Sequence, residues 1–183
     1  LAKGARWITA EPYVLDTSNG DRLRNSFVAA TMKVSLETWN SAAGSAVFGS
    51  RDNSRAVDGA DDIAPDGLNE VLFANIDEPG VIAVTIVWGI LSGKPADRKL
   101  VEWDMIFDDP VLGELGLGLI WGDAGETSET ELGDTTIMDL QSIATHEAGH
   151  AAGLDHPNTS CIEETMSAFA SEGETNKRTL NTG

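Results

Sequence analysis

The sequence predicts an α+β fold: a twisted mixed sheet, one backing helix, and a second helix that leads into an irregular C-terminal part. Three patterns indicate this. Apolar residues recur at helical spacing between residues 21 and 43, two stretches rich in β-branched residues follow, and residues 100–108 alternate between apolar and acidic side chains. Because no linker or internal repeat divides the 183 residues, they are expected to form one domain.

The first helix is expected over residues 21–43, after a strand within residues 7–15. Asp21 is placed to act as its N-cap, and Gly44 is placed to end it. Its apolar stripe is predicted to consist of Val28, Met32, Leu36 and Trp39. This pattern is typical of an amphipathic helix packed on a sheet.

Strands are predicted at residues 71–76, 81–88 and 100–108. The acidic segment 49–70 before them has no apolar period and is expected to be a surface loop. The continuous apolar run of residues 81–88 predicts a strand at the centre of the sheet, buried on both faces. Residues 100–108 are expected to form a half-exposed strand with Glu102, Asp104 and Asp108 on its solvent face.

The remainder of the chain divides at the second helix. Residues 109–135 are Gly-rich, acidic and too long for an ordinary connection, so a metal-binding and a substrate-facing role both stay open. A helix is expected from Thr136 to Ala152, and the chain after Gly153 is expected to be irregular. Residues 1–152 and 153–183 are therefore predicted to form an N-terminal and a C-terminal subdomain.

Charge and composition exclude some classes of function. The 30 Asp and Glu residues outnumber the 12 Lys and Arg residues, for a net charge of −18, which argues against a nucleic-acid partner. No apolar run approaches the roughly 18 residues of a membrane span. A soluble monomer is expected, and Cys161, the only cysteine, cannot form a disulfide within the chain. Since the sequence begins at Leu1 without Met or an apolar leader, a mature, secreted protein is expected.

The segment from His146 to His156 carries the strongest chemical signal. His146 and His150 are four residues apart, so on a helix their imidazoles share one face and can bind one ion. Gly153 stands where the helix must end, and its freedom to adopt positive φ lets the chain turn and return His156 to the same ion. The spacing predicts a zinc site with these three His ligands.

Three imidazoles leave one tetrahedral position for water, which is typical of a catalytic rather than a structural zinc site. Zinc lowers the pKa of bound water to about 7, and Glu147 can accept its proton as the water attacks a peptide carbonyl. A His pair four residues apart also arises by chance on ordinary helices. Here, however, all three His of the chain fall in this one pattern, with Glu and Gly at the positions that the chemistry requires.

The motif His-Glu-x-x-His-x-x-Gly-x-x-His over residues 146–156 resembles the metzincin signature, and Met166 resembles the methionine of its Met-turn. The flanking segments 139–145 and 173–180 are most similar to the matrixins and their microbial relatives. Pro157 is instead similar to serralysins, but Ala168 and Phe169 stand where these carry a Tyr near the metal. The resemblance implies a metzincin-type zincin fold with an active-site helix, and a secreted zymogen that cleaves extended polypeptides. It also implies that residues 100–108 form the antiparallel edge strand that receives the substrate.

Calcium is a second expected cofactor. Oxygen ligands of the kind that calcium prefers are abundant, at Asp104, Asp108, Asp109, Asp123, Glu126 and Asp134. No EF-hand spacing is present, and solvated acidic loops explain the same residues. The resemblance to calcium-stabilised metzincins favours one structural site. A single zinc is expected, because no His is left for the extra zinc site of animal matrixins.

Two other classes of function remain open. The chain is alternatively an inactive protease or an acidic, calcium-dependent binding module, although the presence of Glu147 argues against an inactive protease. It is also compatible with a zinc hydrolase of peptidoglycan or of small peptides. Cleavage of a denatured protein separates the peptidase from both.

Overall fold

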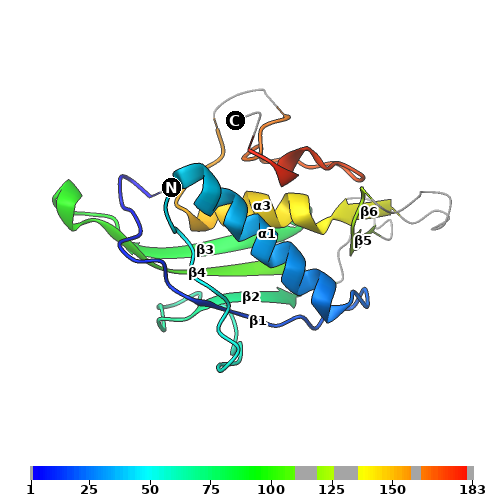
Figure 1. Cartoon of the computed structure of the whole chain (residues 1–183), viewed down its shortest axis with the longest axis horizontal. Helices are drawn as coiled ribbons and strands as arrows, with labels where there is room; N and C mark the ends of the chain where they lie inside the picture. Colours follow the sequence, from blue (N-terminus) through cyan, green and yellow to red (C-terminus); the bar gives the residue numbers. More distant parts are fainter. Residues whose placement is uncertain (1, 110–118, 126–135, 158–161, 181–183) are drawn as a thin grey trace.

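The computed structural model describes residues 2–109, 119–125, 136–157 and 162–180. It shows a mixed α+β fold in which two helices cover one face of a four-stranded sheet (Figure 1). The elements are β1 Tyr13–Leu15, α1 Asn25–Ala43, β2 Asn69–Ala74, β3 Ala83–Ile90, β4 Lys99–Asp108, β5 Leu119–Gly122, β6 Thr136–Asp139 and α3 Leu140–Ala151, with short 3-10 turns at Pro95–Asp97 and Asn176–Arg178. The mixed sheet and both helices agree with the predicted class.

The strand order in the sheet is β1-β2-β4-β3. β1, β2 and β4 are parallel, whereas β3 pairs antiparallel with β4. The prediction that residues 81–88 form a central strand is therefore wrong, because β3 is the last strand of the sheet. Its apolar run has another cause: Ala83 and Val87 pack against the core, while Trp88 on the other face donates to the carbonyl of Asp61. The expected burial on both faces is also wrong, because the residues of β3 are only half-buried and Ile90 is exposed.

Helix α1 begins four residues later than predicted. Arg24 occupies the N-cap position without a side-chain hydrogen bond. Asp21, predicted as the cap, instead accepts a hydrogen bond from the backbone N–H of Trp121 at 2.8 Å and so ties the start of this segment to β5. The predicted end of the helix is confirmed, since Gly44 adopts a left-handed conformation with φ 62°.

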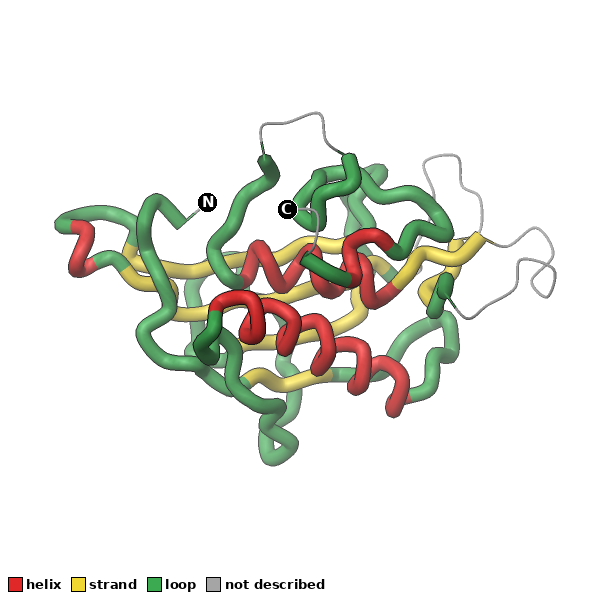
Figure 2. Tube along the Cα trace, turned by 45° about the horizontal axis from the view of Figure 1, so that its top comes forward, coloured by secondary structure: helices red, strands yellow, loops and turns green. Residues whose placement is uncertain are grey.

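The hydrophobic core lies between the sheet and the two helices. In Figure 2 both helices lie in front of the strands of the sheet. Val28, Met32 and Leu36 of α1 and Trp103, Met105 and Phe107 of β4 are all buried there. These are the apolar faces that the periods of 3.6 and 2 predict. α1 also packs along α3, which holds α3 against the sheet.

The opposite face of β4 is buried as well, although residues 100–108 were expected to be half exposed. Glu102 and Asp104 are 0% exposed, and Asp108 is 6% exposed. The segment before β2 covers this face: backbone N–H groups of Asp61 and Gly67 donate to the carboxylates of Asp104 and Glu102. The alternation of apolar and acidic residues therefore predicted correctly which side chains share a face of β4. The acidic face, however, is covered by a loop and not by solvent.

The short strand β6 runs directly into α3, so the predicted helix started four residues too early. Asp139 is the N-cap of α3, and its carboxylate accepts from the N–H of Ser142 at 2.9 Å. β6 pairs with β5, a strand that the sequence did not indicate within residues 109–135. Among the described residues after Gly153, the only helical element is the turn at Asn176–Arg178, which confirms the predicted irregular ending. In the described part of the chain, no helix has the length and apolar character needed to cross a bilayer.

Candidate metal centre

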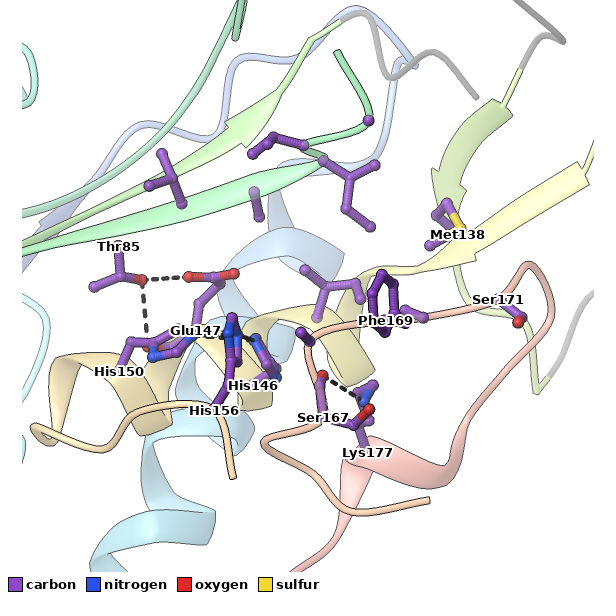
Figure 3. Close-up of a pocket in the computed structure, with 18 of the residues that line it drawn as sticks. Thr85, Met138, His146, Glu147, His150, His156, Ser167, Phe169, Ser171 and Lys177 are labelled. Carbon is purple, nitrogen blue, oxygen red and sulfur yellow. Dashed lines mark hydrogen bonds between the residues drawn. The ribbon is translucent and has the colours of Figure 1, made fainter. Parts of the chain in front are cut away.

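Three imidazoles meet at the C-terminal end of α3 (Figure 3). The Nε2 atom of His150 lies 3.1 Å from Nε2 of His146 and 3.0 Å from Nε2 of His156, and the remaining pair is 3.2 Å apart. In a tetrahedral site with metal–nitrogen distances of about 2.0–2.1 Å, neighbouring nitrogens lie about 3.3 Å apart. The three side chains therefore have the spacing of ligands to one ion and could hold a metal.

Gly153 makes this convergence possible. Its φ is 102°, and its N–H donates to the carbonyl of His150 at 2.8 Å. The helix therefore ends here and the chain changes direction. An added Cβ would approach Ala2 Cβ to 2.9 Å and Leu100 Cδ1 to 3.0 Å. Glycine is thus required at this position both by the backbone conformation and by the packing around it.

Backbone carbonyls orient the two helical imidazoles. Nδ1 of His146 lies 2.7 Å from the carbonyl oxygen of Thr165, and Nδ1 of His150 lies 3.0 Å from that of Leu154. Because a carbonyl oxygen only accepts, each Nδ1 carries the proton and each Nε2 keeps its lone pair toward the shared point. This is the tautomer that a metal ligand needs.

The electrostatics of the site keep these imidazoles neutral. Burial lowers the pKa of His146 to about 3, and it also lowers the pKa of His150. Near pH 7 both side chains are therefore in the form that binds a metal. Within the described residues, no fourth His, Cys or carboxylate joins the group. A tetrahedral ion held by these three ligands has one position for water or substrate.

Glu147 lies beside the three His and is 4% exposed. The Thr85 hydroxyl on β3 donates to its carboxylate at 2.6 Å (Figure 3). Burial raises the pKa of Glu147 to about 7, and the hydrogen bond from Thr85 opposes this rise. A carboxyl group with this pKa can both take up and release a proton near neutral pH.

Met166 packs against α3 at Gly149. A Cβ built on Gly149 would lie 2.2 Å from Met166 Sδ and 2.7 Å from a ring carbon of Trp39. The glycine between Glu147 and His150 therefore lets the methionine and the tryptophan reach the helix backbone. Met166 is 8% exposed and so belongs to the buried packing against this helix.

Three further residues support the site without having been singled out in the sequence. Thr85 holds Glu147, as described above. Lys177 is 1% exposed, and its Nζ donates to the carbonyls of Glu164 and Ser167, on either side of Met166. Arg178 bonds to the carboxylates of Asp139 and Asp123, and so links the C-terminal part to the N-cap of α3. Each contact joins residues far apart in the chain, so local spacing carries no signal for it.

The imidazoles and Glu147 open into a cleft of about 650 Å³. One wall is the segment from Gly80 to Thr85, which includes the start of β3, and residues 167–172 lie across from it. The expectation that residues 100–108 form the antiparallel edge strand is wrong: β4 lies inside the sheet, and β3 is the edge strand. β3 therefore borders the cleft that β4 was expected to border.

Of the six residues proposed for calcium, the four that the structure describes are not gathered at one place. Asp108 accepts from the N–H of Ile76, Asp109 accepts from that of Gly20, and Asp123 pairs with Arg178. Asp104 lies elsewhere, with Asp61 and Glu102. Glu126 and Asp134 lie outside the described residues, as does Cys161.

No model of a protein family matches the chain, and no curated protein matches it either.

Proposed function

We propose that this chain is a zinc-dependent endopeptidase of the metzincin type, similar to the matrixins. The observation that carries the proposal is the placement of a buried carboxylate, Glu147, beside three converging imidazoles in a cleft. A ligand set of three imidazoles fits zinc, which binds nitrogen at about 2.0–2.1 Å in a tetrahedral arrangement. The motif over residues 146–156 supports the same family.

Zinc in this site would polarise the scissile carbonyl and acidify a water molecule. The protein's own contribution to the reaction is the handling of the proton. Glu147 accepts the proton of the attacking water and, once protonated, gives it to the leaving amine. The Thr85 hydroxyl binds the Glu147 carboxylate and holds it in one orientation through both steps.

The free edge of β3 indicates the class of substrate, an extended polypeptide. Because β3 pairs only with β4 among the described strands, its other edge offers main-chain N–H and C=O groups. An extended polypeptide can add to such an edge with little dependence on its sequence, while side chains enter the adjoining pocket. Leu119, Met138 and Ile143 line that cleft together with the imidazoles, which favours apolar side chains at this position.

The test is cleavage of an unfolded protein by the zinc-loaded chain. The wild-type chain is expected to cleave reduced, denatured casein and to lose this activity with a zinc chelator. Glu147→Ala is expected to lower turnover about 10²–10⁴-fold, because the general base is gone, while zinc content by mass spectrometry stays at one ion per chain. Glu37→Ala removes an exposed glutamate on α1 and serves as the matched control.

The outcomes separate the alternatives. A binding module, or an inactive protease, would leave the casein intact at full zinc occupancy. A hydrolase of peptidoglycan or small peptides would cleave those substrates and spare casein. Mapping the cleaved bonds by mass spectrometry defines which side chain enters the pocket. An unchanged rate in Glu147→Ala would remove the proposed base.

A further inference from the structure

A second group of carboxylates lies on the face of the sheet that points away from the helices. Glu102 and Asp104 of β4 alternate with the core residues Trp103 and Met105, so their side chains point to this opposite face. Asp61 comes from the loop that covers it. One carboxylate oxygen of each of Asp61, Glu102 and Asp104 lies within 4.8 Å of the others.

Two of the three carboxylates are deeply buried, and Asp61 is half-buried. Glu102 and Asp104 are 0% exposed, as is the neighbouring Glu70 of β2, which pairs with Asp104 in the sheet register. No Lys, Arg or His of the described residues forms an ion pair with any of them. Buried carboxylates without a cation are costly, since the desolvation of a charge amounts to several kcal/mol even after relaxation.

Backbone N–H groups satisfy four of the six carboxylate oxygens of Glu70, Glu102 and Asp104. Asp104 accepts from the N–H groups of Asp61 at 3.0 Å and Glu70 at 3.2 Å. One oxygen of Glu102 accepts from Gly67, and one oxygen of Glu70 accepts from Asp58 at 2.7 Å. The other oxygens, Glu102 Oε1 and Glu70 Oε2, are buried and have no hydrogen-bond partner in the described structure. Buried polar atoms of this kind require an explanation, such as a bound ion.

We propose that Asp61, Glu102 and Asp104 bind a calcium ion, with Glu70 beside them as an additional negative charge. The donor set consists of oxygen alone, which suits a hard cation and disfavours zinc. Calcium accepts several carboxylates in irregular geometry, whereas magnesium demands a near-ideal octahedron and keeps most of its waters. Several carboxylates lie close together here, and one of them comes from a loop, so the site favours calcium over magnesium.

The alternative to a cation is protonation of the acids. Burial, reinforced by Glu102 and Glu70, raises the pKa of Asp104 to about 7, and burial also raises the pKa values of Glu102 and Glu70. A proton would relieve part of the repulsion and would turn one carboxylate oxygen into a hydrogen-bond donor. A calcium ion would balance the negative charge and could also bind an unpartnered oxygen. Calcium binding and protonation therefore differ in whether added calcium stabilises the fold.

The proposed ion would link the loop to the substrate-binding edge. Asp61 offers its carboxylate to the group, and its carbonyl accepts from Trp88 Nε1 at 3.1 Å. Trp88 lies on β3, three residues after Thr85. Calcium would therefore hold the covering loop, β4 and β3 together on the face opposite the cleft. This site does not depend on the peptidase activity, and it shares only Asp104 with the residues that the sequence suggested.

The experiment uses the zinc-loaded, full-length chain, first passed over a calcium-selective chelator. Titration with CaCl₂ is followed by calorimetry and by the melting temperature, and TbCl₃ is followed by luminescence sensitised by the nearby Trp88. One high-affinity ion per chain and a melting temperature that rises with calcium are expected, because an ion bound only by the folded state stabilises it. MgCl₂ at the same concentrations is expected to have the smaller effect.

Variants locate the ion. Asp61→Asn and Glu102→Gln are expected to weaken calcium binding at least tenfold and to abolish the thermal response. Asp62→Asn removes an equal charge from the exposed neighbour and is expected to bind as the wild type does. Asp61 is only half-buried, so its variant keeps the test usable if Glu102→Gln does not fold. A wild-type melting temperature indifferent to calcium, preference for magnesium, or equal binding by Asp61→Asn and Asp62→Asn would each overturn the proposal.

Discussion

The hydroxyl of Thr85 donates a 2.6 Å hydrogen bond to the carboxylate of Glu147. Sixty-two residues separate the two in the chain. The bond joins the edge strand β3 to the helix α3, so the strand that would receive a substrate also orients the proposed general base. A change at either residue is therefore expected to affect catalysis without affecting the imidazoles.

Thr85→Val is expected to lower kcat about tenfold. A hydrogen bond to a charged group contributes about 1.5–3 kcal/mol, and each 1.4 kcal/mol of barrier changes the rate tenfold. KM is expected to change little, because the hydroxyl binds Glu147 and not the substrate. Steady-state kinetics on a fluorogenic peptide measure both constants. Thr85→Ser keeps the hydroxyl and should restore most of kcat; equal loss in both variants would point to a packing role instead.

Removal of one imidazole is expected to release the metal. His156→Ala leaves only the two ligands of α3, so zinc should be lost on dialysis against a mild chelator that the wild type resists. Metal content by mass spectrometry is the measurement. Thr85→Val retains all three imidazoles and serves as the control for metal retention. Full retention by His156→Ala would show that His156 is not a ligand.

Gly149→Ala is expected to destabilise the fold by about 1–3 kcal/mol, the usual effect of overpacking. The new methyl group would meet Met166 and Trp39 well inside contact distance. Urea denaturation measures the loss. Because the nearest clash is with the flexible side chain of Met166, Met166→Ala should partly relieve it, so the double variant is expected to lose less than the sum of the two single variants. Strict additivity would mean that the two residues do not meet.

Arg178→Gln is expected to destabilise the fold by about 3–5 kcal/mol. The guanidinium bonds to Asp139, which is 1% exposed and caps α3, so its removal leaves a buried carboxylate uncompensated. Thermal unfolding measures the change. Lys33→Met breaks the exposed pair of Lys33 with Glu37, at 3.6 Å, and is expected to cost no more than about 1 kcal/mol. Similar losses in both variants would contradict the buried ion pair.

The helical parts of the fold could be predicted because their cause is local. The period of Val28, Met32 and Leu36 and the glycine at position 44 predict α1 and its end, and both are confirmed by the structure. The spacing of His146, His150 and His156 likewise predicts their convergence, since one helix face and one glycine turn are enough to bring them together. These features need no information from the rest of the chain.

Sheet order, burial and partners were decided by tertiary structure. An apolar strand has the same composition at the edge as at the centre, so residues 81–88 were assigned to the wrong position. An acidic strand face looks solvent-exposed until a loop covers it, as happens at Glu102 and Asp104. The hydrogen bond from Thr85 to Glu147 joins residues that only the packing of α3 on β3 brings together. By itself the sequence determined which three imidazoles can hold a metal, because helix periodicity and one glycine turn act over a few residues. The fold alone decided which strand flanks them and which carboxylates are buried, because those contacts depend on segments distant in the chain.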